Sequence, residues 1–380
     1  MPLSRTSLEK PDALLAKLKR RIASEGAITL AQYIETCLSD PDHGYYATRD
    51  PFGVQGDFTT APEISQVFGE LIGLWCVAVW QDMGQPSTLR LAELGPGRGT
   101  LMADALRAAA LAPEFLTATD IHLVETSPVL RGVQAKQLEA CAMKPLWHDR
   151  LGDVPEGAAI IIANEFLDAL PVRQFVRREG AWFERCVGVS DEDGLAFCLA
   201  SEPLETPEML PQGVRIGAQD GDIAEIRPGA DALVEDLAIR VKNHPLAALF
   251  IDYGHRQSAP GETLQAVKAH KFAGPLATPG EADLTAHVDF ARLGETARNN
   301  ALQVHGPISQ ADFLNALGLR ERCERLMEKA GGNDRELIAS GVQRLAGPTQ
   351  MGELFKVMAL TSEGLTPPPF ADSLKSGVNT

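Results

Sequence analysis

The sequence predicts an α/β fold in which buried strands alternate with helices around a mostly parallel sheet. Three observations support this prediction: short apolar runs suited to buried strands, amphipathic helical patterns between them, and polar or glycine-rich segments where the runs end. The apolar runs lie at residues 89–94, 121–124, 158–163 and 246–251. In such a fold, ligands bind at the carboxyl ends of the strands.

The chain has 380 residues, which suits a large domain with insertions or two domains. Its formal net charge of −16 argues against a nucleic-acid partner, because nucleic-acid-binding proteins carry basic patches. An acidic surface is compatible with a cationic substrate such as an arginine- or lysine-bearing protein. It is equally compatible with a role in solubility alone.

The six cysteines form no C-x-x-C pair, and the eight histidines show no H-E-x-x-H spacing. We therefore expect reduced thiols and no metal site. No run of 18 apolar residues is present, so we expect no membrane span. The first ten residues lack the apolar segment of a signal peptide, which predicts a cytoplasmic protein in a bacterium.

Residues 1–85 are predicted to form an N-terminal helical cap. Helical patterns cover 12–25, the segment after Thr29, and the stripe from 64 to 79. Thr60 and Glu63 have the spacing of a capping box before that stripe. The long polar loop ahead of it contains Gly56-Asp57-Phe58, and such loops are commonly functional, so Asp57 is a candidate site residue.

The segment from Glu93 to Thr100 is the most informative part of the chain. A strand ends at an acid, Glu93, and is followed by Gly95, Gly97 and Gly99 at the start of a helical pattern. Dinucleotide sites have Gly-x-Gly-x-x-Gly instead, and an acid here would repel a diphosphate. It would attract the amino group and the sulfonium of S-adenosylmethionine, although a tight turn without a ligand has the same pattern.

Two further strands end in polar residues. Glu125 follows the strand at 121–124, where an acid can accept hydrogen bonds from both ribose hydroxyls. Asn164, Glu165 and Asp168 follow the strand at 158–163, at the edge where chemistry is expected. The alternatives are a surface acid at 125 and a helix N-terminus, capped by Asn164 and favouring acids, at 164–168.

Residues 86–366 are predicted to form the core domain, with an inserted β region at about 172–230. Alternating hairpin strands occupy 172–200, whereas 201–230 has the composition of a loop or linker. Residues 283–289 are expected to begin a helix. The polar segment 367–380 is expected to form a flexible tail. An exposed edge of the insert would suit pairing into a homodimer or docking of a target.

Several separated motifs together resemble the MidA family, which includes a mitochondrial arginine methyltransferase that assists assembly of respiratory complex I. The resemblance extends from about residue 12 to 362. The motifs that carry it are Gly56–Ser65, Glu93–Thr100, Val124–Pro128, Asn164–Pro171, Ile251–Gly254 and Asp283–Asp289.

The resemblance implies a class I (Rossmann-like) S-adenosylmethionine-dependent methyltransferase with an N-terminal helical region and an inserted β region. It also implies symmetric dimethylation of an arginine in the quinone-site subunit of complex I. A eukaryotic member would work in the mitochondrial matrix. One departure lies at 264–270, where relatives have a more basic and aromatic run.

Methyl transfer to arginine needs help from carboxylates, because a guanidinium stays protonated and is a poor nucleophile. Carboxylates can hold it in a bidentate pair and accept a proton as the product forms. We assign this role to Glu165, with Asp168 or Asp57 as the second carboxylate.

The remaining candidates are assigned to the cofactor. Its methionine end is expected to be held by Glu93, Gly95 and Gly97, and its ribose by Glu125. The other candidate cofactor-binding residues are Gly99 and Asn164. The competing hypotheses are a nicotinamide-dependent oxidoreductase, which the glycine spacing disfavours, and a non-catalytic assembly factor that retains the fold.

Overall fold

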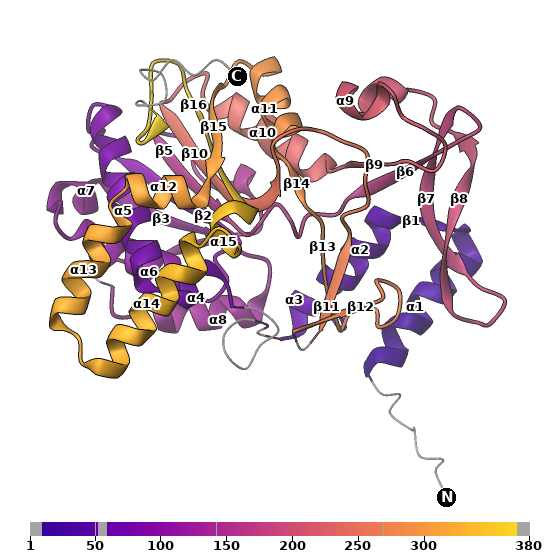
Figure 1. Cartoon of the computed structure of the whole chain (residues 1–380), viewed down its shortest axis with the longest axis horizontal. Helices are drawn as coiled ribbons and strands as arrows, with labels where there is room; N and C mark the ends of the chain where they lie inside the picture. Colours follow the sequence, from indigo (N-terminus) through magenta and orange to yellow (C-terminus); the bar gives the residue numbers. More distant parts are fainter. Residues whose placement is uncertain (1–9, 50, 52–58, 142, 269, 371–380) are drawn as a thin grey trace, which may run out of the picture.

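The computed structural model describes residues 10–49, 51, 59–141, 143–268 and 270–370 (Figure 1). In this part of the chain the central sheet has eight strands, ordered β15-β16-β10-β5-β2-β3-β4 with β14 beside β10. Their bounds are β2 Leu89–Leu94, β3 Thr119–Val124, β4 Leu146–His148, β5 Ala159–Asn164, β10 Leu246–His255, β14 Val288–Asp289, β15 Gln303–Ser309 and β16 Phe355–Thr361.

The predicted α/β fold is confirmed. Strands β4, β3, β2, β5 and β10 are parallel, and β16 is antiparallel to β10. The chain passes from β2 outward to β3 and β4, then returns to β5 on the other side of β2. This reversal opens a crevice at the carboxyl ends of β2 and β5, where an open α/β sheet binds its ligand.

Helices cover both faces of the central sheet (Figure 1). Alternate residues of each strand face opposite cores, because side chains in a strand alternate. Ile160 and Ile162 belong to the core built with α5 and α6, whereas Ile161 faces α10 and α11. The helices and 3₁₀ turn of these layers are α4 Ala61–Ile64, α5 Gln66–Asp82, α6 Thr100–Ala109, α7 Pro113–Ala118, α8 Pro128–Gln137, η1 Leu151–Asp153, α10 Pro228–Arg240, α11 Phe290–Asn299, α12 Gln310–Ala316, α13 Leu319–Lys329, α14 Gly332–Ala346 and α15 Met351–Leu354.

A second sheet is built from the inserted region and one short N-terminal strand. Strand β7 pairs with β1, β6 and β8, and β9 pairs with β6. The strands are β1 Ile28–Thr29, β6 Arg173–Arg178, β7 Ala181–Val189, β8 Leu195–Pro203 and β9 Ile223–Ile226. The expectation of a loop throughout 201–230 is therefore wrong, because this segment also contains η2 Pro207–Met209 and α9 Gln212–Arg215.

The N-terminal region is divided between two hydrophobic cores. Helices α1 (Lys10–Glu25), α2 (Leu30–Ser39) and α3 (Tyr45–Thr48) lie beside the insert, and Leu18, Tyr33 and Val187 share one core. That core also receives residues from a small sheet of β11 Gln265–Lys268, β12 Lys271–Ala273 and β13 Asp283–Thr285. Helix α5 instead packs in the core of the central sheet. The expected division at residues 85 and 86 does not coincide with a change of core.

Three local expectations differ from the structure. Thr60 precedes α4, but its side chain makes no capping hydrogen bond, and Ser65 caps the long helix α5. Residues 283–285 and 288–289 form β13 and β14, which pair with β11 and β10, and the expected helix, α11, begins only at Phe290 with Asp289 as its N-cap. The beginning of the expected tail is packed, because Trp75 Nε1 donates to the carbonyl of Pro368 at 2.7 Å and Phe370 is buried.

Helices α5 and α6 approach closely at Gly73. A Cβ at this position would lie 2.3 Å from the carbonyl oxygen of Ala105. We expect Gly73→Ala to lower the thermal unfolding midpoint through overpacking worth about 1–3 kcal/mol.

Gly132 in α8 provides the matched control, because a Cβ there meets no atom within 4 Å. Gly132→Ala should stabilise the protein by about 0.5–1 kcal/mol, since alanine is the better helix former. Equal midpoints for the two variants in scanning calorimetry would contradict this account of the helix contact.

Candidate functional site

A cavity of about 410 Å³ lies at the carboxyl ends of β2, β3 and β5. It is lined by Gly95 and Gly97 of the glycine loop, by Glu125 after β3, and by Glu165 after β5. Leu38, Ser39 and Tyr46 line it from the N-terminal helices, and Ala232, Leu233 and Asp236 line it from α10. Four of the sequence-predicted residues, from three separate segments of the chain, therefore line one cavity.

The glycine loop requires its glycines for conformation and for close approach. Gly95, Gly97 and Gly99 have φ values of 62°, 53° and 82°, in the left-handed region that side chains disfavour. A Cβ on Gly95 would lie 2.8 Å from Cδ2 of Phe166. Gly99 is the N-cap of α6, so the loop leads directly into a helix N-terminus.

Glu93 and Asn164 both line a small space of about 40 Å³ beside the main cavity. They are 3% and 8% exposed, and neither Glu93 Oε2 nor Asn164 Oδ1 has a hydrogen-bond partner among the described residues. Burial raises the pKa of Glu93 to about 8. Buried acceptors without donors are costly, so this pair fits a ligand that brings donors, such as the amino group of S-adenosylmethionine.

Glu125 is held in a defined orientation at the end of β3. Its Oε1 accepts from the backbone N–H of Ser127 at 2.8 Å, and its Oε2 accepts from Nε2 of Gln134 at 3.1 Å. Burial raises the pKa of Glu125, while these bonds favour the carboxylate. A carboxylate can accept about four hydrogen bonds, so Glu125 can still accept from a ribose hydroxyl.

Glu165 follows β5 with a left-handed backbone (φ 49°). Its Oε1 accepts from the backbone N–H of Ala61, the first residue of α4, at 2.9 Å, and from Asn164 Nδ2 at 3.3 Å. Burial, with a contribution from the nearby Asp168 charge, raises the pKa of Glu165 to about 7. This carboxylate can therefore accept and release a proton near neutrality.

The turn after Glu165 is fixed by a second buried acid. Asp252, at the end of β10, accepts from the backbone N–H groups of Leu167 and Asp168 at 2.9 and 3.1 Å. Burial raises the pKa of Asp252 well above its ordinary value. The role of Asp252 in the site was not predicted from the sequence, where only its position at the end of a strand pointed to it.

Asp168 lies behind the cavity instead of lining it. Its Oδ2 accepts from the hydroxyl of Tyr253 at 2.7 Å, and it is 7% exposed. Asp57 lies outside the described residues. Tyr46 does line the cavity, and its hydroxyl donates to Asp283 Oδ1 at 2.8 Å.

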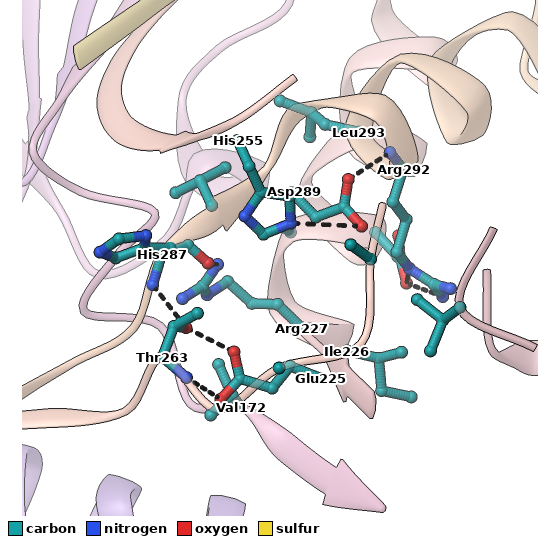
Figure 2. A pocket seen from close by; sticks show the side chains of 16 residues that line it. Val172, Glu225, Ile226, Arg227, His255, Thr263, His287, Asp289, Arg292 and Leu293 are labelled. Atoms are coloured by element: carbon teal, nitrogen blue, oxygen red, sulfur yellow. Dashed lines mark hydrogen bonds and ion pairs between the residues drawn. The ribbon is translucent and has the colours of Figure 1, made fainter. Parts of the chain in front are cut away.

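A smaller polar pocket of about 40 Å³ lies between β9, β14 and α11 (Figure 2). Arg227 crosses it and donates to the carbonyls of Leu170 at 3.1 Å and Ala286 at 2.8 Å. Thr263 donates to Glu225 and accepts from the backbone N–H of His287. These bonds tie the 283–289 motif to the turn that carries Glu165 and Asp168.

Within the described ranges, no group of three or more His, Cys, Asp or Glu side chains has a metal-binding arrangement. The same part of the chain contains no helix with the length and apolar character needed to cross a membrane.

Comparison with known proteins places the geometry in context. Residues 71–308 match the family described as "Putative S-adenosyl-L-methionine-dependent methyltransferase". The chain is 37% identical to the mitochondrial protein arginine methyltransferase NDUFAF7 homolog of Drosophila melanogaster, over 94% of this chain and 87% of that protein. It is also 37% identical to mitochondrial human NDUFAF7, covering 91% and 83% of the two chains.

A solved structure from Burkholderia thailandensis, bound to S-adenosyl-homocysteine, is similar throughout. It has 31% sequence identity and a TM-score of 0.80, and the alignment covers 96% of each chain. A second crystal structure from the same organism gives a TM-score of 0.79 with the same identity and coverage.

Gly95→Ala should abolish detectable binding of S-adenosylhomocysteine. The new Cβ would be strained by the left-handed backbone and would contact the Phe166 ring, so the loop would have to move. Isothermal titration calorimetry measures the affinity. Gly84→Ala is the matched control, because Gly84 has φ 81° but a Cβ there meets no atom within 4 Å. Wild-type affinity in Gly95→Ala would show that the ligand lies elsewhere.

Proposed function

Because the chain belongs to this family of S-adenosyl-L-methionine-dependent methyltransferases, we propose that it methylates an arginine side chain of a protein. The observation that carries the proposal is Glu165, a carboxylate titrating near neutrality in the same cavity as the glycine loop. The names of the related NDUFAF7 enzymes support arginine as the acceptor.

The charge of the cavity favours a cationic acceptor. Among the described residues that line it, four are acids and Arg150 is the single arginine or lysine. The acids are Glu125, Asp149, Glu165 and Asp236. Asp168 and Asp252 add two buried acids behind the wall, opposite the buried Arg227. A guanidinium entering this cavity would be attracted by the ionised acids that line it.

In the proposed mechanism, Glu165 orients the guanidinium and accepts its proton. S-adenosylmethionine supplies a methyl group on a sulfonium. A nitrogen lone pair forms the new N–C bond, the S–C bond breaks with its electrons on sulfur, and the nitrogen proton passes to Glu165. The bonds from Ala61 and Asn164 hold Oε1 in place, which leaves Oε2 for the guanidinium.

The remaining sequence assignments belong to the same proposal. Glu93, Asn164 and the loop glycines Gly95, Gly97 and Gly99 would hold the methionine end of the cofactor, and Glu125 the ribose. Asp168 would act through Tyr253 and the charge it places near Glu165, because it does not line the cavity. Asp57 stays a candidate for the second carboxylate on the acceptor.

The acceptor that we propose is an arginine of the quinone-site subunit of respiratory complex I, converted to symmetric dimethylarginine. This choice rests on the resemblance of the sequence motifs to the MidA family. The curated eukaryotic relatives are named mitochondrial.

The pH dependence of methyl transfer should report the ionisation of Glu165. Because the carboxylate form accepts the proton and its pKa is raised to about 7, kcat/KM should rise with pH below 7 and level off above it. Glu165→Gln should bind S-adenosylhomocysteine normally and lower kcat by about 10²–10⁴-fold. The exposed Glu235 of α10 provides the control variant, Glu235→Gln. A fully active Glu165→Gln enzyme would remove Glu165 from the mechanism.

The acceptor can be sought with the enzyme and its Glu165→Gln variant. Extracts of cells lacking the gene are incubated with methyl-labelled S-adenosylmethionine and each protein, and the labelled peptides are sequenced by mass spectrometry. We expect label on an arginine of a complex I subunit with the wild-type enzyme alone. Label on another residue type would refute arginine as the acceptor, and label on another protein would refute complex I.

A further inference from the structure

Gln134 is a fully buried polar residue on the inner side of α8, between the glycine loop and β3. Its exposed fraction is 0%. A buried amide is costly unless its donors and acceptor are used, so its partners indicate what it holds in place.

The amide of Gln134 joins three parts of the cofactor region. Nε2 donates to the carbonyl of Gly97 at 2.8 Å and to Glu125 Oε2 at 3.1 Å. Its Oε1 accepts from the indole Nε1 of Trp147, on β4, at 2.8 Å. Since an indole N–H can only donate, this contact fixes which end of the amide is oxygen and turns the NH₂ group toward Gly97 and Glu125.

The two amide hydrogens thus match two acceptors in different segments. One acceptor belongs to the loop that leads into α6, and the other to the acid that follows β3. A trans peptide is planar, so fixing the Gly97 carbonyl toward α8 also points the N–H of Arg98 away from α8. Gln134 therefore sets the orientation of the loop peptide and of the Glu125 carboxylate together.

We propose that Gln134 is a positioning residue for S-adenosylmethionine, which aligns Glu125 with the ribose while holding the glycine loop at its methionine end. Gln134 is not among the residues that line the cavity, and it acts through groups that do. The proposal rests on the assignment of Glu125 to the ribose, and it is independent of the acceptor.

Replacement of Gln134 by methionine tests the proposal, because the side chain keeps its length and loses both donors. We expect the Kd for S-adenosylhomocysteine to rise at least about tenfold, given the usual worth of hydrogen bonds to charged groups. Gln137→Met is the matched control, since Gln137 is exposed at the end of the same helix. Circular dichroism and the thermal midpoint establish that each variant is folded.

A second ligand distinguishes a role of Gln134 in positioning Glu125 from a general loss of structure at the binding site. The 2′-deoxy analogue of S-adenosylhomocysteine lacks one of the hydroxyls from which Glu125 would accept a hydrogen bond. The wild-type protein should prefer the natural ligand, and Gln134→Met should lose most of this preference. A merely structural role would weaken both ligands alike and leave their affinity ratio unchanged, which would overturn the proposal.

Two further variants complete the test. Trp147→Phe removes only the donor that fixes the amide, and it should weaken binding and discrimination less than Gln134→Met does. It also keeps the proposal testable if Gln134→Met fails to fold, because unchanged binding and discrimination in Trp147→Phe would then count against it. Glu125→Gln should lose the preference for S-adenosylhomocysteine over its 2′-deoxy analogue. If this variant keeps the preference, the assignment of Glu125 to the ribose is wrong and the proposal is overturned. The acceptor experiments do not affect any of these outcomes.

Discussion

The hydrogen bond from the first amide of α4 to Glu165 is the constraint that organises the site. Helix α4 is one turn long, and its Glu63 accepts from the hydroxyl of Thr100, the first residue of α6, and pairs with Arg98 of the glycine loop. The same short helix therefore touches the carboxylate after β5 and the loop after β2. Because those strands are neighbours, α4 bridges the two sides of the crevice where the strand order reverses.

Buried acids around this bridge are tolerated for different reasons. Asp252 accepts backbone N–H groups, so its cost is offset by structure that it stabilises. Glu93 has an oxygen with no donor among the described residues, and the donors of the proposed cofactor would satisfy it. Glu165 lies between these two cases: one of its oxygens accepts a backbone hydrogen bond, and its pKa is raised to about 7. These three environments match the three proposed roles of support, cofactor binding and proton acceptance.

Much of the fold could be predicted from the sequence, and so could four residues of the cavity lining, Gly95, Gly97, Glu125 and Glu165. The strands at 89–94 and 159–164 are mostly apolar. Glu93, Glu125 and Glu165 occur at or directly after the ends of these two strands and of the strand at 119–124. Local patterns failed where distant pairing decides the structure. Residues 283–289 do lead into a helix, which Asp289 caps, but most of them pair as strands first, and β9 lies in a segment rich in turn residues. Gln134 and Asp252 were missed because their importance depends on contacts across the fold.

The pairing of β1 with β7 has a consequence for how this protein can be divided. Ile28 and Thr29 lie opposite Val187 and Cys186, so a segment near the N-terminus completes the sheet of an insertion more than 140 residues later. The two pieces share a core, and the N-terminal piece contributes Leu38, Ser39 and Tyr46 to the cavity wall. A chimera that exchanged either piece alone would pair β1 with a foreign β7, or β7 with a foreign β1, and would divide the shared core. The N-terminal helices and the insert should therefore be transplanted as one unit.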